Sequence, residues 1–428
     1  MTKDHIKIHQ KFVIFFPYKK YLNSANMIEN IKTVNDFNFK NKTAIVRVDF
    51  NVPINNNLII DDTRIQYSLP TIRKIIHDHG KVVLISHFGR PKGIPSKIYS
   101  LRFMISYLSH QLKIPIKFSE YCIGSSVEKY VNELKNGEVL LLENIRFHKE
   151  EEEGNEKFAF QLAKLGDIYV NDAFGVSHRF HSSITIIPKF FKNKKCIGFL
   201  MKKEIQSLQK ILGKGKKPIT ILLGGAKITS KISIIKNIIH LIDNILIGGG
   251  MAYPFIKVQG GKIGNSILEK YNEIEKILKN IIDLYQKQNQ TNIHFPKDVV
   301  IADSFNNKAN TKIVPIYSIP NGWKGLDIGP QSIKYFCDII RKSKTILWNG
   351  PLGVFEFSNF SFGTKSIAKA IVNSTEKGAF SLVGGGDSIA ALRMENYENK
   401  ISYLSTGGGA MLECLKQTIL PGIKAIIE

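Results

Sequence analysis

The sequence predicts an α/β protein built as two similarly sized domains, each a parallel sheet flanked by helices, joined by a hinge. The chain has 428 residues, which is long for one hydrophobic core and favours two domains. Short apolar runs alternate along it with segments whose apolar residues recur every three or four positions, as strands separated by helices do. Strands that are apolar on both faces indicate parallel sheets covered on both sides. Each domain is therefore expected to be Rossmann-like.

The expected strands fall into one set in each half of the chain. They are 43–50, 81–88, 114–118, 138–147 and 167–174 in the first half, then 218–225, 244–250, 299–305, 344–350 and 379–387 in the second. Helical periodicity is expected over 230–242 and 363–373. The segment 187–215 holds a proline, clustered lysines and the helix-like run FLMKKEIQSLQKIL. We expect this segment to join the two halves.

Hydrophobicity and cysteine usage point to a cytoplasmic protein. No run approaches the roughly 18 apolar residues of a membrane span, and FVIFF at 12–16 is shorter than a secretory core of about 7 to 15 residues. The four cysteines are far apart and form no CxxC pair. Free thiols in a reducing cytosol are the simplest interpretation.

The formal charge of +24 raises the hypothesis of nucleic-acid binding, since a Lys- and Arg-rich surface that covers phosphates releases counterions. A binding surface usually has a concentrated basic stripe or a known module. Here the excess is mostly Lys scattered over the whole chain, and the dense clusters are KNKK at 192–195 and KGKK at 214–217. We favour compositional drift, with no nucleic-acid partner, although the charge should attract anions at long range.

Charged and polar side chains follow the strands of the first half. They are Asp49, Asn51, His87, Arg90, Arg146, His148, Asp172, Arg179 and His181, with Arg64 in the turn after the first strand. Ligands of open parallel sheets bind at the carboxyl ends of the strands, and Arg grips phosphate or carboxylate in bidentate fashion. Any one Arg could instead cap a helix or pair with a surface acid. Together these cations predict an anion pocket.

Glycines follow the strands of the second half. The runs are LLGGAK (222–227), IGGG (247–250), WNGPLG (348–353) and VGGGDS (383–388). Glycine lets backbone N–H groups approach a ligand, and a helix beginning at Asp387 or Ser388 would present free N–H groups to a phosphate. Lys227 and Lys231, four apart on one expected helix face, add to a nucleotide polyphosphate site. Neither a Walker A motif nor GxGxxG after a strand occurs.

An anion pocket in one domain and a nucleotide pocket in the other predict phosphoryl transfer across a cleft. Ten motifs resemble the phosphoglycerate kinase family in order and spacing, over a region from about Met27 to the C-terminus. They are RVDFNVP, SHFGRP, LLENIRFH, YVNDAFGVSHRFHSS, GGAKITSKI, GGGMAYPF, GWKGLDIGP, WNGPLGVFE, GGGDS and STGGGA. So many long motifs make the resemblance highly specific.

The resemblance implies a monomeric glycolytic enzyme that moves a phosphoryl group reversibly between 1,3-bisphosphoglycerate and ADP, giving 3-phosphoglycerate and MgATP. It implies a phosphoglycerate-binding domain over 27–198, a nucleotide-binding domain over 199–409, and a C-terminal segment, 410–428, that packs back on the first domain. Residues 1–26 would be an unmatched extension.

The resemblance also implies roles for particular residues. The phosphoglycerate would be held by Asp49, Phe50, Asn51, Arg64, His87, Phe88, Gly89, Arg90, Arg146 and Arg179. The nucleotide would be held by Lys231, Gly325, Glu356, Gly385, Gly386, Asp387 and Ser388, with Glu356 on the ribose and Asp387 toward Mg²⁺. Arg64, Lys227, Gly385 and Gly386 would act on the transferring group. Ser388 stands where some members carry Thr.

Two other functions compete with this hypothesis. A basic nucleic-acid-binding protein would bind DNA or RNA with a steep salt dependence and without turnover. A different acyl-phosphate kinase would phosphorylate another carboxylate.

The extension generates a first prediction. Residues 1–26 could be a targeting presequence, a binding tail or a stretch that is not translated in the cell. They contain Asp4 and hold Lys rather than Arg, unlike an organellar presequence, and we predict that Met27 is the true start. We expect a chain that begins at Met27 to fold and turn over like the full chain, because terminal segments that pack on nothing cost little to remove. The N-terminal mass of the native protein identifies the start, and a lower melting temperature or activity of the shortened chain would contradict the prediction.

Overall fold

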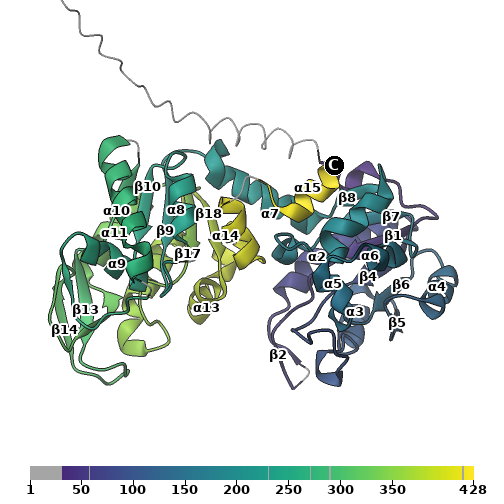
Figure 1. The fold of residues 1–428 in the computed structure, drawn as a ribbon, viewed down its shortest axis with the longest axis horizontal. Helices are drawn as coiled ribbons and strands as arrows, with labels where there is room; N and C mark the ends of the chain where they lie inside the picture. Colours follow the sequence, from purple (N-terminus) through teal and green to yellow (C-terminus); the bar gives the residue numbers. More distant parts are fainter. Residues whose placement is uncertain (1–30, 57, 230, 270, 289–290, 417–418) are drawn as a thin grey trace, which may run out of the picture.

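The computed structural model describes residues 31–56, 58–229, 231–269, 271–288, 291–416 and 419–428. Two parallel sheets lie in separate halves of the chain, each with helices on its faces (Figure 1). The predicted α/β class, with two helix-flanked parallel sheets, is confirmed. The predictions for residues 1–26 and for a start at Met27 lie outside the described residues. No described helix has the length and apolar character needed to cross a membrane.

The first sheet has the strand order β5-β6-β4-β1-β7-β8. Its strands are β1 (Thr43–Arg47), β4 (Lys81–Ile85), β5 (Ile116–Ser119), β6 (Val139–Leu142), β7 (Ile168–Asn171) and β8 (Lys195–Ile197). In the central strands Arg47 aligns with Ile85 on one side and with Asn171 on the other. The segments that follow β1, β4 and β7 therefore leave the sheet at the same edge.

The second sheet repeats this arrangement with the order β12-β10-β9-β17-β18-β19. Its strands are β9 (Ile219–Leu223), β10 (Asn244–Ile247), β12 (Asn292–His294), β17 (Thr345–Asn349), β18 (Phe380–Gly384) and β19 (Tyr403–Ser405). Leu223 aligns with Ile247 and Asn349, and Gly384 aligns with Ser405. The glycine-rich segments thus also gather at one sheet edge.

The expected strand 299–305 belongs to neither parallel sheet, and that prediction is wrong. β13 (Asp298–Ala302) pairs antiparallel with β14 (Thr311–Pro315) and with β16 (Lys324–Ile328). The link from β13 to β14 is too short for a parallel crossover, which needs about a dozen residues or more. Two further small sheets pair β2 (Ile54–Asn55) with β3 (Leu58–Ile59) and β11 (Lys262–Ile263) with β15 (Ser318–Ile319).

Helices cover the sheets and join them. They are α2 (Thr63–His77), α3 (Met104–Leu112), α4 (Ser125–Asn132), α5 (Lys149–Glu153), α6 (Glu156–Ala163), α7 (Phe199–Gln209), α8 (Ile232–Ile238), α9 (Ala252–Val258), α10 (Tyr271–Gln288), α11 (Pro330–Lys342), α12 (Phe362–Glu376), α13 (Gly386–Met394), α14 (Gly408–Lys416) and α15 (Pro421–Ile427). The periodic segment 230–242 contains α8, and 363–373 lies within α12; Ser230 itself is not described. The helix expected to start at Asp387 or Ser388 is α13.

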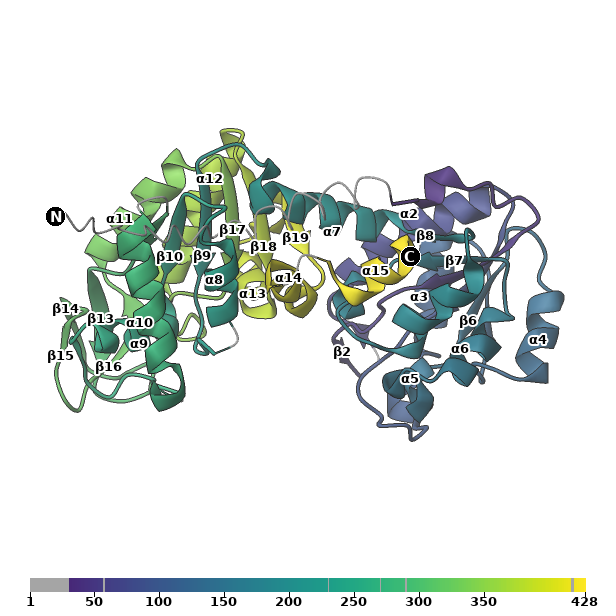
Figure 2. The ribbon, with the colours of Figure 1, turned by 45° about the horizontal axis from the view of Figure 1, so that its top comes forward.

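The helix α7 lies between the two sheets, within the segment expected to join the halves (Figure 2). Its buried stripe includes Leu200, Glu204 and Leu208, spaced four apart. The C-terminal helix α15 lies beside the first sheet in Figures 1 and 2: the Gly422 N–H donates to the Ser177 carbonyl at 2.8 Å, and Lys195 Nζ donates to the Ala425 carbonyl at 2.9 Å. The exact domain boundaries stay a prediction.

Candidate active site between the two sheets

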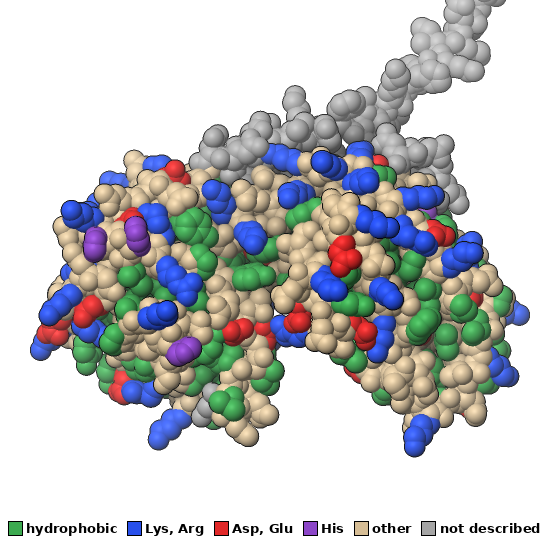
Figure 3. Space-filling view, turned by 180° about the vertical axis from the view of Figure 1, so that it is seen from behind, with side chains coloured by type: hydrophobic (Ala, Val, Ile, Leu, Met, Phe, Trp, Pro, Cys, Tyr) green, Lys and Arg blue, Asp and Glu red, His purple; other side chains and the backbone are tan. Residues whose placement is uncertain are grey.

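A cavity of about 310 Å³ lies between the carboxyl ends of the two sheets. Asn51 and Arg64 line it from the first half, and Gly385, Gly386 and Thr406 line it from the second. The space-filling view also has a notch between the two lobes (Figure 3). The cavity therefore brings together predicted site residues that are more than 300 positions apart in the sequence.

Arg64 is held by both halves of the molecule. It lies in the first turn of α2, where its Nη1 donates to the Asn51 carbonyl at 2.7 Å and to Asp49 Oδ1 at 3.3 Å. Its Nε donates to the Thr406 carbonyl at 3.1 Å. The side chain is 31% exposed. Its guanidinium is thus positioned at the cavity wall and can still reach a ligand.

The loops after β1 and β4 fix each other. The Phe50 N–H donates to Ser86 Oγ at 2.9 Å, and Asn51 Oδ1 accepts from the Gly89 N–H at 2.9 Å. The Phe88 N–H donates to Asn144 Oδ1 at 3.2 Å. Gly89 has φ +60°, and an added Cβ would lie 2.4 Å from the Tyr99 ring, so this turn requires glycine.

The histidines of this edge are neutral rather than cationic. His87 is buried, with Nε2 at 3.9 Å from Asp49 Oδ1. Burial, with the nearby charge of Arg47, holds the pKa of His87 well below its usual value. Burial and the charge of Arg146 lower the pKa of His181 to about 3. Our interpretation of His side chains as strand-end cations is therefore wrong, and the arginines supply the positive charge.

The remaining predicted arginines lie outside the lining of the 310 Å³ cavity. Arg146 is largely buried; its Nη1 donates to the Gly89 carbonyl at 2.8 Å, and its Nε lies 3.2 Å from Glu152 Oε1. Arg90 and Arg179 are exposed. Arg146 thus follows β6 and is tied to the loop after β4 through the Gly89 carbonyl.

A buried ionic network under this edge was not predicted. Arg47, with no exposed surface, donates through Nε to Ser183 Oγ at 2.8 Å, and its Nη2 lies 3.3 Å from His87 Nδ1. Glu151, also fully buried, lies 4.0 Å from Arg47 and accepts from the Ser183 hydroxyl at 2.6 Å. The sequence did contain a sign of this network: Arg47 lies in the otherwise apolar strand TAIVR, and a buried charge requires a partner.

The glycine loops of the second half pack backbone against backbone. The Gly224 N–H donates to the Asn349 carbonyl at 3.0 Å, and the Gly225 N–H donates to the Pro351 carbonyl at 2.7 Å. An added Cβ at Gly224 would lie 2.2 Å from the Pro351 carbonyl oxygen. Glycine is required here for close approach between loops. This contact leaves the edge of the second sheet lined by main chain.

Lys227 and Lys231 do not share a helix face, so that expectation is wrong. The glycine loop continues past Lys227, and α8 begins only at Ile232, with Lys231 at its N-cap. Lys231 Nζ donates to the Gly224 carbonyl at 2.6 Å and to the Asn349 carbonyl at 3.3 Å. Burial lowers the pKa of Lys231 to about 8, although Asp387 opposes the shift. The ammonium thus lies among the glycine loops.

The first turn of α13 points its free N–H groups at the cleft edge. Gly385 precedes the helix with φ +98°, and Gly386 and Asp387 are exposed. The Ser388 hydroxyl is buried and accepts from the Gly350 N–H at 2.7 Å. Ser388 therefore anchors the neighbouring loop through its side chain.

Gly325 and Glu356 lie outside the 310 Å³ cavity. Gly325 is on β16, where its N–H donates to Ser266 Oγ at 3.0 Å and an added Cβ would lie 2.0 Å from the Tyr253 hydroxyl. Glu356 is exposed in the loop after β17.

Within the described ranges, no three His, Cys, Asp or Glu residues group so as to hold a metal ion. Mg²⁺ in phosphoryl-transfer sites is commonly held by one or two carboxylates together with substrate phosphates. The exposed carboxylate of Asp387, at the edge where the helix N–H groups are free, fits that kind of site.

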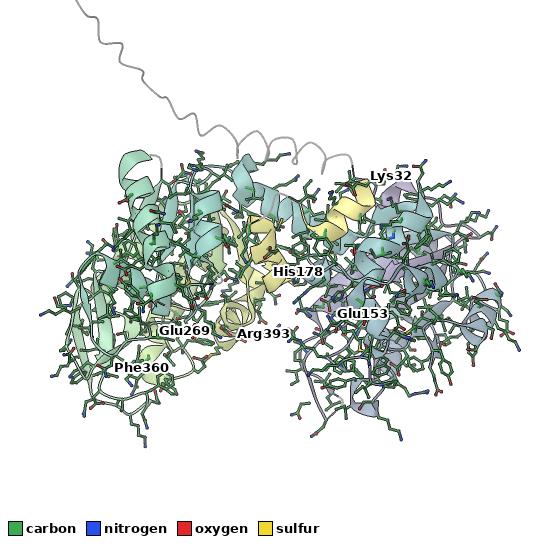
Figure 4. The ribbon with its side chains drawn as sticks, viewed as in Figure 1. Lys32, Glu153, His178, Glu269, Phe360 and Arg393 are labelled. Atoms are coloured by element: carbon green, nitrogen blue, oxygen red, sulfur yellow. The ribbon has the colours of Figure 1, made fainter. Side chains whose placement is uncertain are left out.

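Two further contacts were not predicted: one joins α7 to the end of β19, and the other joins the two halves. Glu204 of α7 accepts from the Thr406 N–H at 2.7 Å and the Ser405 hydroxyl at 2.9 Å. Arg393 of α13 lies at the side of the second half that faces the first (Figure 4), with Nη2 at 2.9 Å from Asp61 Oδ2. Glu204 could have been found from the sequence, since it lies on the apolar stripe of its helix.

Comparison with known proteins gives a consistent match. The sequence model described as phosphoglycerate kinase matches residues 34–418. A phosphoglycerate kinase of Porphyromonas gingivalis is 44% identical over 92% of this chain and 99% of its own length. The cytosolic phosphoglycerate kinase 3 of Arabidopsis thaliana is 44% identical over 93% and 98%. The solved phosphoglycerate kinase of Coxiella burnetii has a TM-score of 0.83 at 35% identity, covering 92% of this chain and 98% of that one.

The buried network generates a stability prediction. Glu151→Ala should lower the free energy of unfolding by about 3–5 kcal/mol, because it leaves the buried Arg47 guanidinium without its counter-charge. Glu153→Ala, at the exposed end of the same helix (Figure 4), should change it by less than about 0.5 kcal/mol. Denaturant unfolding of both variants measures the difference, and equal stabilities would show that the network carries no such energy.

Proposed function

The chain belongs to the phosphoglycerate kinase family, and from this we propose how its two halves divide the reaction. It transfers a phosphoryl group reversibly between 1,3-bisphosphoglycerate and ADP, giving 3-phosphoglycerate and ATP, in glycolysis. The observation that carries the assignment to particular residues is the cavity lined by Arg64 from one half and by Gly385 and Gly386 from the other.

The phosphoglycerate would lie on the first half. Asp49, Asn51 and the turn His87–Arg90 lie at the sheet edge beside Arg64, while Arg146 and Arg179 would bind the distant phosphate. This division is supported by the neutral histidines, because arginines then provide the charge that selects an anion. The two mutually bonded loops that carry Phe50, Phe88 and Gly89 would set the shape of the pocket.

The nucleotide would lie on the second half. Lys231 and the free N–H groups of Gly386 to Ser388 would bind its phosphates, and Gly325 and Glu356 would hold the nucleoside, with Glu356 on the ribose. Mg²⁺ would be held by Asp387 together with phosphate oxygens, and when bound it would neutralise charge on the nucleotide. We further propose that the protein is a monomer, and that it is cytoplasmic, as is the cytosolic relative in Arabidopsis thaliana.

The chemistry needs positioning and charge rather than a protein nucleophile. In the direction of ATP consumption, a carboxylate oxygen of 3-phosphoglycerate forms the bond to the γ-phosphorus as the bond from phosphorus to the bridging oxygen breaks. ADP leaves with that electron pair, so no proton has to be moved. Arg64, Lys227 and the N–H groups at Gly385 and Gly386 would stabilise charge on the transferring group.

Closure of the cleft would complete the site. Several proposed phosphate ligands, such as Lys231 and Arg146, lie outside the present cavity. A hinge movement around α7 would bring the two substrates into line and exclude water, which would otherwise accept the phosphoryl group. A coupled assay with 3-phosphoglycerate and MgATP tests the activity directly. Steep salt-dependent binding to DNA or RNA without turnover would favour the alternative function instead.

Arg64→Ala should lower kcat far more than it weakens nucleotide binding, because the guanidinium would act on the reacting end of the substrate. Loss of such a charge stabiliser costs about 2.7–4 kcal/mol, or roughly 100- to 1,000-fold in rate. Arg73→Ala, on the exposed face of the same helix, is the control and should turn over normally. Near-normal turnover of the Arg64 variant would remove this residue from the mechanism.

Lys231→Ala should chiefly raise the KM for ATP and ADP, whereas Lys227→Ala should chiefly lower kcat. A contact made equally to bound and reacting phosphate changes affinity, while one made only in the transition state changes rate. Lys236→Ala, exposed on α8, controls for the general loss of charge. Steady-state kinetics measures all three variants. Their melting temperatures separate a loss of nucleotide affinity from a loss of stability when the loop contacts of Lys231 are removed. Identical profiles for Lys227 and Lys231 would refute this division.

A further inference from the structure

A second cavity, of about 600 Å³, lies along α7. Lys203, Lys210 and Lys214 line it from the helix and the turn that follows, and Phe380 and Tyr403 line it from β18 and β19. These elements lie beside one another where α7 meets the second sheet (Figure 2). The cavity shares no lining residue with the cleft between the sheets, so it is a separate site.

Aromatic faces hold two of the lysines in place. Lys210 Nζ lies 4.0 Å from the centre of the Phe380 ring, and Lys203 Nζ lies 5.3 Å from the centre of the Tyr403 ring. Cation–π contacts of this kind fix the ammonium groups without neutralising them. Lys203 on α7 and Lys210 at its C-cap are seven residues apart, so the two lie on the same side of the helix.

The described lining of this cavity carries lysines and no acidic side chain. No described carboxylate lies within 4.0 Å of Lys203 or Lys210. Elsewhere Lys and Arg are spread over both lobes (Figure 3). Like charges brought together around one hollow repel each other, and a bound anion would relieve that repulsion.

Hydroxyl and amide groups lie between the lysines. Gln206, Ser207 and Ser402 also line the cavity and can donate hydrogen bonds to oxygen. The volume lies within the range of about 300–1,000 Å³ typical of small-molecule sites, and is larger than a single phosphate needs. We propose that this cavity binds a soluble ligand with two or more linked phosphate groups, held by Lys203 and Lys210.

The test uses inorganic triphosphate as the probe and the full chain as the protein. Hydrogen exchange measured by mass spectrometry reports on 199–214 directly. The lysine variants separate binding here from binding in the cleft, because they leave every residue that lines the cleft unaltered. The test variant is Lys203→Glu with Lys210→Glu. The control is Lys157→Glu with Lys164→Glu, which changes one lysine on α6 and one just after it. These two lysines have the same spacing as the test pair, and Lys164 Nζ also lies near an aromatic ring, 5.3 Å from the centre of Phe160. Neither lysine lines this cavity.

Triphosphate should slow exchange in 199–214 of the unaltered chain and of the control. The Lys203/Lys210 variant should lose this protection and bind triphosphate at this site about tenfold or more weakly, because it replaces two charge-assisted donors with like charges. Unchanged melting temperatures establish that the variants fold. An absence of protection in the unaltered chain, or an equal loss in the control, would overturn the proposal. If vesicles with phosphoinositide headgroups slow exchange in 199–214 and triphosphate does not, the proposal that the ligand is soluble is wrong.

Discussion

The position of Arg64 at the cleft depends on the buried carboxylate of Glu204, which joins α7 to the end of β19. It lies on α7 and accepts hydrogen bonds from the Thr406 N–H, the Thr406 hydroxyl and the Ser405 hydroxyl at 2.7, 2.8 and 2.9 Å. The Thr406 carbonyl then accepts from Arg64 at 3.1 Å. Burial raises the pKa of Glu204 to about 7, so its charge depends on these donors. The joining helix thereby positions the arginine at the cleft.

Most of the fold could be predicted from the sequence because its main signal is periodic and local. Apolar runs bounded by glycine and polar residues located the central strands, and parallel pairing then aligned their carboxyl ends. The strands β8, β12 and β19 were missed because each has three residues, too few to establish a period. β13 was assigned to the wrong sheet because an apolar strand does not reveal which neighbour it pairs with.

The sequence predicts which loops form the site, but it does not predict the protonation states of the side chains on them. Motifs identified the arginines and the glycine runs, whereas the neutrality of His87 depends on burial and on Arg47. Arg47 donates a hydrogen bond to Ser183, 136 residues further along the chain, and a local sequence pattern cannot predict a contact between residues so far apart. The placement of Lys231 likewise depends on carbonyls of two separate loops. Long-range packing thus decides the electrostatics of residues that sequence alone can only locate.

The contacts within each half and the contacts across the cleft differ in kind. Inside the first half, Arg47 and Glu151 are fully buried, and breaking such a pair costs about 3–5 kcal/mol. Across the cleft, the Arg393 and Asp61 side chains are 37% and 24% exposed, and pairs open to solvent contribute about 0–1 kcal/mol. The cross-cleft pair can therefore break at little cost while the buried network keeps the loops at the edge of the first sheet in shape. An enzyme that acts by positioning needs both properties: rigid loops, and a gap that opens to admit and release substrates.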